Sequence, residues 1–371
     1  MRPAFASIRQ AAAFALLLLV LLLLPALLGK SNLPPREQIY SSIWWANGAF
    51  PYIDNQFFKE KGDIDIAFIG PSHIWNAINT PHVQKQLSER LGRPAVVRSF
   101  CWGGAGYDML YSVAQDLLQH RKVHMLVFYD AYTDMNLPNG LAPHLFRWGD
   151  NADELTGLSL PLKLSYYFAA VIGMPRNLLS LTRSNIPADL FSSKMNFWEI
   201  QDHADNFVRS LGSLASQSGF RHHPLSDPEV PFERYIPTST ASPADVCVYS
   251  SSNKGPFEFT GSMVPLWQLH FARKFAETAN EHGSKLVLLH IPGTDEMRSD
   301  VIQEREFWPD ALQAEVTMVG IPPAKLFGGL SDAEVYKLFG DPGHLNKNGQ
   351  EYFTEMITPS LLQIYDSKTN P

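Results

Sequence analysis

Two short segments, far apart in the chain, carry the side-chain types of a nucleophilic serine site. Ser72 follows a Gly-Pro pair at the end of a short apolar run, where a strand is expected to stop. Asp341 and His344 flank a Pro-Gly pair, which is typical of a type II β-turn. Across that turn the Asp341 carboxylate can accept the proton of His344 Nδ1, leaving Nε2 as a base for the Ser72 hydroxyl.

Each segment also has a purely structural interpretation. Asp-Pro-Gly turns are common as solvated turns before a helix, and Ser72 can cap a helix that follows the strand. The segment around Ser72 lacks the second glycine of the G-x-S-x-G elbow, which argues against an α/β-hydrolase. Because a hydroxyl nucleophile needs an oriented base, the combination favours a triad in the order Ser72, Asp341, His344.

Groups that stabilise an oxyanion are expected at the ends of the neighbouring strands. Gly104 lies in a glycine-rich turn, where its backbone N–H can act together with the backbone N–H of Ser72. The third strand runs into Asp130, after which Tyr132 can donate through its hydroxyl and Asn136 offers an amide from further along. Asp130 can instead orient another group, so the third donor stays open.

Two further histidines adjoin the expected crevice. His73 directly follows the nucleophile, and packing or a backbone hydrogen bond is favoured over contact with substrate. His290 ends the fourth expected strand, where burial with one satisfied hydrogen bond is at least as good an interpretation as a role in the site.

The sequence predicts neither a metal nor a nucleotide cofactor. Cys101 and Cys247 fit no zinc spacing and are expected to be two buried thiols, with one disulfide as the upper limit. The adjacent pair His222 and His223 makes a poor chelate and is expected in a surface loop. The glycine-rich turn lacks the spacing of a dinucleotide fingerprint.

Strands and helices are expected to alternate on either side of a proline-rich region. This rhythm predicts a three-layer α/β/α sandwich of about five parallel strands, with the functional crevice beyond their carboxyl ends. The expected strands are residues 64–70, 95–100, 123–129, 285–291 and 315–319, and the expected helices follow residue 72 and cover 109–120, 264–282 and the C-terminal region around 352–357.

Composition supports a folded body. The 371 residues are 45% hydrophobic and 18% charged, which excludes a disordered polymer and a small disulfide scaffold. With a net charge of -7, the protein as a whole does not attract the negatively charged phosphate backbone of nucleic acids, so nucleic acid is not an expected partner.

The N-terminal region predicts a membrane anchor. Residues 11–28 carry no charge and are long enough to cross a bilayer, while Arg2 and Arg9 precede them. We therefore expect a cytoplasmic tail and single transmembrane helix over 1–30, with the rest outside; a cleaved signal peptide is the alternative. A linker and aromatic-rich docking segment follows over 31–62, then a domain over 63–371 with a proline-rich insertion or cap at about 135–260.

The blocks at these strand ends resemble the SGNH (GDSL-type) hydrolase superfamily, and within it the membrane-anchored branch of DltD-like and alginate O-acetylation-type proteins. Residues 68–73 look like the nucleophile block, Gly104 falls at the oxyanion glycine of the second block, and residues 341–346 look like the final Asp-x-x-His block. The resemblance covers 64–134 and 285–357. Two departures are the missing asparagine of the third block and Ser99 where the second block often begins with asparagine.

The resemblance implies a function and a location. It implies a flavodoxin-like SGNH fold and a serine esterase or O-acyltransferase that transfers acetyl or D-alanyl groups on cell-envelope polysaccharide or another envelope substrate. It also implies an inner-membrane protein whose domain faces the periplasm or exterior, beside a multispanning O-acyltransferase. A lipid or thioester esterase and a non-catalytic glycan-binding scaffold of an envelope assembly stay open as alternatives.

Overall fold

The computed structural model describes most of the strand-and-helix body and part of the remaining chain. The described residues are 7–30, 37, 39–40, 50–130, 138–145, 155–167, 234–249, 255–261 and 264–367. Tyr132, Asn136 and the His222–His223 pair, to which the sequence gave possible roles, lie outside these ranges. The centre of the proline-rich insertion does so as well.

A six-stranded sheet in the order β2-β1-β3-β6-β8-β4 forms the centre of the protein. The first five strands are parallel to their neighbours, and the short edge strand β4 is antiparallel to β8. The predicted α/β architecture with about five parallel strands is therefore confirmed. The strands are β1 (Ile64–Pro71), β2 (Val97–Trp102), β3 (Val123–Phe128), β4 (Cys247–Tyr249), β6 (Lys285–Leu289) and β8 (Val316–Gly320).

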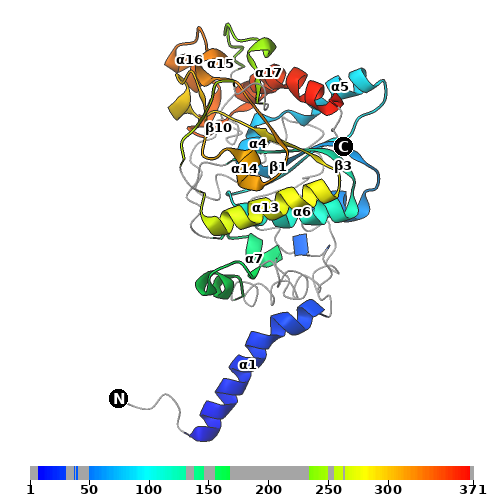
Figure 1. Cartoon of the computed structure of the whole chain (residues 1–371), viewed down its shortest axis with the longest axis vertical. Helices are drawn as coiled ribbons and strands as arrows, with labels where there is room; N and C mark the ends of the chain where they lie inside the picture. Colours follow the sequence, from blue (N-terminus) through cyan, green and yellow to red (C-terminus); the bar gives the residue numbers. More distant parts are fainter. Residues whose placement is uncertain are drawn as a thin grey trace.

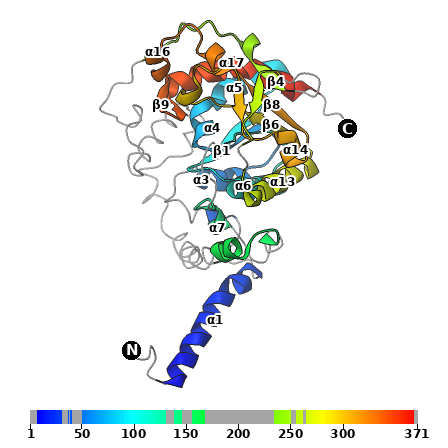
Figure 2. The same ribbon diagram turned by 60° about the vertical axis from the view of Figure 1, so that its left-hand side comes forward.

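Helices cover both faces of this sheet, as Figures 1 and 2 show. Helices α6 (Tyr107–His120) and α13 (Leu266–Glu281) lie side by side on one face, while α5 (Thr80–Leu91) and α17 (Lys347–Asp366) lie on the other. Rings from strand and helix meet in the core, as where Phe128 and Phe275 pack edge to face with centroids 5.1 Å apart. Strands buried on both faces explain the continuous apolar runs in the sequence.

The helical segment after β1 is divided in two. Helix α4 (Ser72–Ala77) ends before Asn79, whose side chain accepts a hydrogen bond from the His82 backbone N–H at 3.1 Å and so caps α5. The sequence pattern did not reveal this break, because the capping residue Asn79 lies inside the segment that looks helical.

Shorter elements surround the sheet. Strands β5 and β7 form a parallel pair, and β9 and β10 form an antiparallel pair. The bounds of these shorter elements are α3 (Phe50–Asp54), η1 (Asn55–Lys59), α7 (Ala142–Leu145), η3 (Pro243–Asp245), β5 (Phe257–Phe259), η4 (Thr294–Glu296), β7 (Ile302–Glu304), α14 (Trp308–Leu312), α15 (Pro323–Leu326), α16 (Asp332–Tyr336), β9 (Phe339–Asp341) and β10 (His344–Leu345).

The described part of the aromatic-rich segment packs on this body. The Tyr40 hydroxyl donates to Asp116 Oδ2 at 2.6 Å, and its ring meets Phe57 at 5.8 Å between centroids. Phe57 in turn packs against Phe100 of β2, with centroids 4.9 Å apart. These contacts bury aromatic surface that would otherwise face water.

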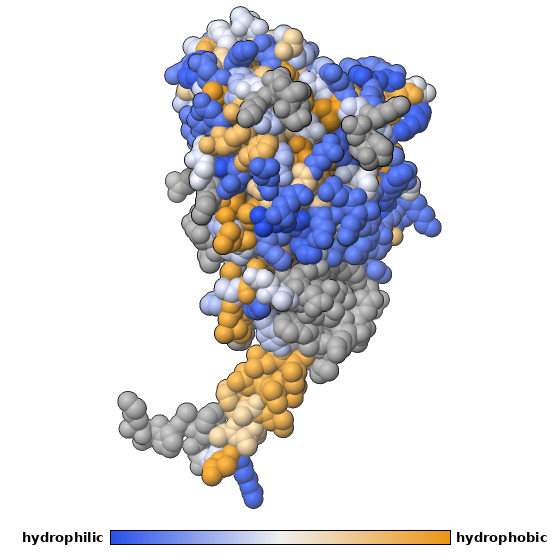
Figure 3. Space-filling view, in the orientation of Figure 1, coloured by the Kyte–Doolittle hydropathy of each residue, from blue (hydrophilic) through white to orange (hydrophobic). Residues whose placement is uncertain are grey.

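The N-terminal helix α1 (Ile8–Lys30) extends away from the body and carries an apolar surface (Figure 3). Within the described ranges, however, no helix has both the length and the apolar character needed to cross a membrane. The transmembrane anchor over residues 1–30 therefore stays a prediction from the sequence.

Candidate functional site

Ser72, His344 and Asp341 form one hydrogen-bonded chain. Ser72 Oγ lies 2.8 Å from His344 Nε2, although the two residues are 272 positions apart. On the other side of the ring, His344 Nδ1 lies 2.8 Å from Asp341 Oδ1 and 2.9 Å from Oδ2. The structure thus brings together the three residues that the sequence singled out, in the predicted order of contacts.

The nucleophile candidate sits where β1 gives way to α4. Gly70 has φ +153°, a conformation that side chains rarely adopt, and a Cβ there would lie 3.1 Å from Ile74 Cδ1. Pro71 then ends the strand, and Ser72 begins the helix. Because the chain changes direction here, the Ser72 hydroxyl lies at the carboxyl end of β1, within hydrogen-bond distance of His344 Nε2.

The Asp341 carboxylate organises its own turn. Its Oδ1 accepts the backbone N–H groups of Gly343 and His344, each at 2.9 Å, in addition to the imidazole. Burial opposes ionisation, but these hydrogen bonds outweigh it and hold the pKa of Asp341 below its ordinary value. The carboxylate is therefore charged at neutral pH and fixes the orientation of the His344 ring.

Helix α17 joins the two halves of the site. It begins directly after β10, and its buried Gln350 and Thr354 donate to backbone carbonyls at the end of α4. The distances are 3.1 Å from Gln350 Nε2 to Trp75 O and 3.1 Å from Thr354 Oγ1 to Ala77 O. These buried polar contacts lock the helix that starts with Ser72 against the helix that follows His344.

His73 stacks on the catalytic-histidine candidate. Its ring lies 4.2 Å from that of His344 and 5.2 Å from that of Tyr129, centroid to centroid. Burial, together with the charge of His344, lowers the pKa of His73 to about 3, so the ring is neutral at physiological pH. This agrees with the predicted packing role, and within the described chain its buried Nδ1 has no hydrogen-bond partner.

The oxyanion region contains a residue that the sequence analysis did not identify. Gly104 has φ +81°, and a Cβ there would lie 3.4 Å from Nδ2 of Asn139. Asn139 Nδ2 donates to Ala105 O at 3.0 Å, which leaves its second N–H for a ligand. Asn139 lies eleven positions beyond the end of β3, and the Asn139-Gly140 pair signals a turn in the sequence but does not connect it with the site.

A buried carboxylate holds this asparagine in place. Asp108 Oδ2 accepts the Asn139 backbone N–H at 2.9 Å and the Tyr166 hydroxyl at 2.5 Å. Gln268 of α13 binds both Asp108 Oδ1, at 3.4 Å, and the backbone N–H of Tyr107, at 2.6 Å. Burial raises the pKa of Asp108 despite these donors. The glycine-rich turn is thereby tied to α6, α13 and the described edge of the insertion.

If Asn139 donates to an oxyanion, Asn139→Ala lowers the rate of Ser72 acylation by about 10²- to 10³-fold, the usual cost of one such donor. The measurement is the rate of ester turnover or covalent labelling. Asn79→Ala is the matched control, because it also removes a side-chain acceptor for a nearby backbone N–H, here His82 rather than Leu141. Equal losses in both variants would assign Asn139 a structural role only.

Asp130 does not join the serine chain. It is buried in an ion pair with Arg305, whose Nε donates to Oδ2 at 2.9 Å and whose Nη2 contacts Oδ1. The Tyr107 hydroxyl also donates to Asp130 Oδ1, at 2.8 Å. Of the roles left open by the sequence, Asp130 therefore takes that of orienting other groups.

His290 belongs to a buried charged cluster behind the site. Its Nδ1 lies 3.2 Å from Glu304 Oε1, while Nε2 forms an ion pair at 3.4 Å with Glu296 without the alignment of a hydrogen bond. Burial opposes the charge on the imidazole, but the two carboxylates raise its pKa to about 10. The following Thr294 donates its backbone N–H to Pro342 O at 2.9 Å, so this loop supports the turn of Asp341 and His344.

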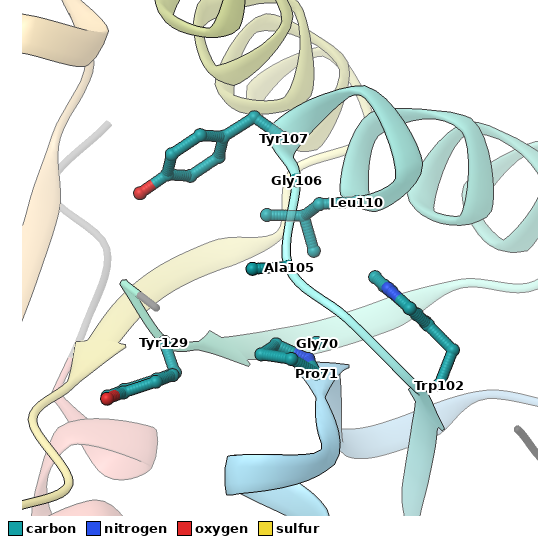
Figure 4. A pocket seen from close by; sticks show the side chains of 8 residues that line it. All are labelled: Gly70, Pro71, Trp102, Ala105, Gly106, Tyr107, Leu110 and Tyr129. Carbon is teal, nitrogen blue, oxygen red and sulfur yellow. The ribbon is translucent and has the colours of Figure 1, made fainter. Parts of the chain in front are cut away.

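A small pocket opens beside Ser72. It is lined by Gly70, Pro71, Trp102, Ala105, Gly106, Tyr107, Leu110 and Tyr129, which come from the carboxyl ends of β1, β2 and β3 and the start of α6 (Figure 4). Its position at the carboxyl ends of parallel strands is where ligands bind in open α/β sheets. The pocket thus borders Pro71, which directly precedes Ser72, and Trp102 and Ala105, which lie on either side of Gly104 in the chain.

The remaining sequence predictions concern metals and thiols. In the described part of the chain, no cluster of three or more histidine, cysteine, aspartate or glutamate side chains is arranged to hold a metal ion. Cys101 and Cys247 are free thiols; the first is buried as expected, whereas the second is only half-buried.

The fold and the site define an α/β protein that presents a serine, a histidine and an aspartate as one hydrogen-bonded chain beside a mixed sheet of mainly parallel strands. Comparisons with protein families, with curated proteins and with solved structures give no match to this chain.

Proposed function

We propose that the protein is a serine esterase or O-acyltransferase that works through a covalent acyl-Ser72 intermediate. The single observation that carries this proposal is the pair of contacts on His344, 2.8 Å from Ser72 Oγ on one side and 2.8 Å from Asp341 on the other. In this arrangement His344 takes the Ser72 proton, Asp341 stabilises the resulting imidazolium, and the hydroxyl oxygen attacks the ester carbonyl.

The remaining steps follow from the groups around Ser72. The oxyanion of the tetrahedral intermediate would be stabilised by the backbone N–H groups of Ser72 and Gly104 and by Asn139 Nδ2. His344 then donates its proton to the leaving alcohol, and in the second half-reaction it activates water or an acceptor hydroxyl. In this proposal Asn139 would take the place of the asparagine that is missing directly after the third strand, an absence that was one of two arguments for a non-catalytic scaffold.

The substrate and the location are proposed from the resemblance to the SGNH superfamily. The anchored relatives imply an acylated cell-envelope polysaccharide or a lipid-linked envelope substrate, and a multispanning O-acyltransferase as partner. We propose a single-pass inner-membrane protein with its site on the periplasmic or extracellular side. This location is proposed because residues 11–28 carry no charge and Arg2 and Arg9 precede them.

The proposal is tested by covalent labelling of the full-length protein in detergent with a fluorophosphonate probe, followed by intact mass and peptide mapping. We expect one label, on Ser72, and no label in Ser72→Ala. Ser88→Ala is the control, because the Ser88 hydroxyl donates to Gln84 O within α5 and plays no part in the site. A folded protein that takes up no label, or a label that persists in Ser72→Ala, would contradict the proposal.

A further inference from the structure

His73 takes part in two stacking contacts, one of them with the candidate base. Its imidazole stacks on that of His344, with centroids 4.2 Å apart and an interplanar angle of 26°. It also stacks on the ring of Tyr129, with centroids 5.2 Å apart and an angle of 29°. The three rings come from separate parts of the chain, namely the start of α4, the end of β3 and the turn between β9 and β10. The base is therefore held by contacts besides those to Ser72 and Asp341.

The surroundings of His73 fix its ring relative to the catalytic turn. His73 is the second residue of α4, and buried side chains of α17 hold the other end of that helix. On the turn itself, a Cβ added to Gly343 would lie 3.1 Å from His73 Nε2, so the ring lies against the backbone directly before His344. A ring held in this way restricts rotation of the His344 imidazole, whose Nε2 lies 2.8 Å from Ser72 Oγ.

His344 is the ring of this stack that becomes charged in the proposed reaction. Burial and the charge of His344 lower the pKa of His73 to about 3, and burial raises the pKa of Tyr129 well above its ordinary value, so both of these rings are neutral at physiological pH. His344 is 8% exposed, so water has little access to the imidazolium that forms when Ser72 loses its proton. The face of a neutral aromatic ring attracts a cation that lies over it, and this attraction is stronger where water is excluded.

We infer that His73 is a positioning residue for the base: its ring holds the His344 imidazole in the orientation that reaches Ser72, and the face of this ring stabilises the imidazolium. The inference rests on the proposed function and deepens it, because it requires His344 to act as the base. It differs from a simple packing role, which any apolar side chain of similar size would fill. Here His73 supplies an aromatic face, and its nitrogens take no part in the proton transfer.

The test replaces the His73 side chain in the full-length protein and measures fluorophosphonate labelling of Ser72 over a range of probe concentrations. Such kinetics separate the rate of the chemical step from the binding of the probe. His73→Leu and His73→Met both fill the space without an aromatic face. We expect each to slow the chemical step by about 10- to 100-fold, because a small misplacement of a catalytic group costs up to about 100-fold, and to leave probe binding unchanged.

An aromatic ring without an ionisable nitrogen should restore the rate. His73→Phe keeps an aromatic face but is larger than histidine. Thienylalanine, introduced at position 73 by stop-codon suppression, keeps both the face and the size of the imidazole. We expect at least one of these two variants to label within about threefold of wild type, because the face that lies on the imidazolium is retained.

His120→Leu is the matched control for the loss of a histidine ring. His120 also packs on an aromatic ring, that of Phe58, with centroids 4.6 Å apart, but it lies at the end of α6 and outside the site. This variant should label at the wild-type rate. Thermal unfolding of each variant checks that it is folded.

Failure of the inference can be told apart from failure of the proposed function. The inference alone is overturned if a folded His73→Leu or His73→Met protein labels as fast as wild type, or if the loss lies in probe binding. It is also overturned if both aromatic replacements are as slow as His73→Leu. If the folded wild-type protein takes up no label on Ser72, the proposed function fails and the inference fails with it.

Discussion

Asp341→Asn is expected to slow Ser72 acylation by about 10⁴-fold, the loss typical of a serine triad whose aspartate becomes an amide. The backbone N–H groups of Gly343 and His344 both point at Oδ1, so the amide oxygen is expected to keep that place and preserve the turn. The amide nitrogen then falls where Oδ2 now lies, 2.9 Å from His344 Nδ1. It donates to Nδ1 and favours the tautomer that carries its proton on Nε2, which cannot accept the Ser72 proton.

The rate is measured by fluorophosphonate labelling of Ser72 in the full-length protein, with thermal unfolding as the check on folding. Asp332→Asn is the control for the same chemical change, because Asp332 is exposed and pairs only at the surface with Arg298. If Asp341→Asn folds normally and labels within tenfold of wild type, Asp341 does not orient the base.

Arg305→Met is expected to destabilise the protein by about 3–5 kcal/mol, because it leaves the Asp130 carboxylate buried without its cation. Asp130 is 2% exposed and Arg305 is 7% exposed, so water cannot replace the lost partner. The free energy of unfolding is measured with urea on the full-length protein. The double variant Asp130→Asn with Arg305→Met should recover much of the loss, since no unpaired charge then remains.

Arg298→Met is the matched control for this ion pair. Arg298 and Asp332 lie at the surface, with side chains 47% and 62% exposed, and such a pair contributes only about 0–1 kcal/mol. A loss in Arg305→Met no larger than that in Arg298→Met would show that the buried pair contributes little. The variants at Arg305 and Asp130 also test whether the pocket depends on the buried ion pair, because Tyr107 lines the pocket and donates to Asp130.

The strand-and-helix framework and the three residues of the serine chain could be predicted from the sequence. Apolar runs of strand length alternate with amphipathic helical segments, and this local periodicity survives in the folded protein because it reflects which face of each element is buried. Ser72 at a strand end and the Asp341–His344 turn were also predictable, since both depend on neighbouring residues whose backbone preferences are strong.

The groups around the serine chain depend on contacts that form only in the folded protein. Asp108 binds the backbone N–H of Asn139 beside Gly104, Asp130 pairs with an arginine 175 positions away, and Leu110 lines a pocket at the ends of three strands. These contacts join residues with no shared period or spacing, and their strength comes from burial, which withdraws the polar groups from water and so makes an unpaired donor or charge costly. Such contacts exist only once the sheet and its helices have assembled around them.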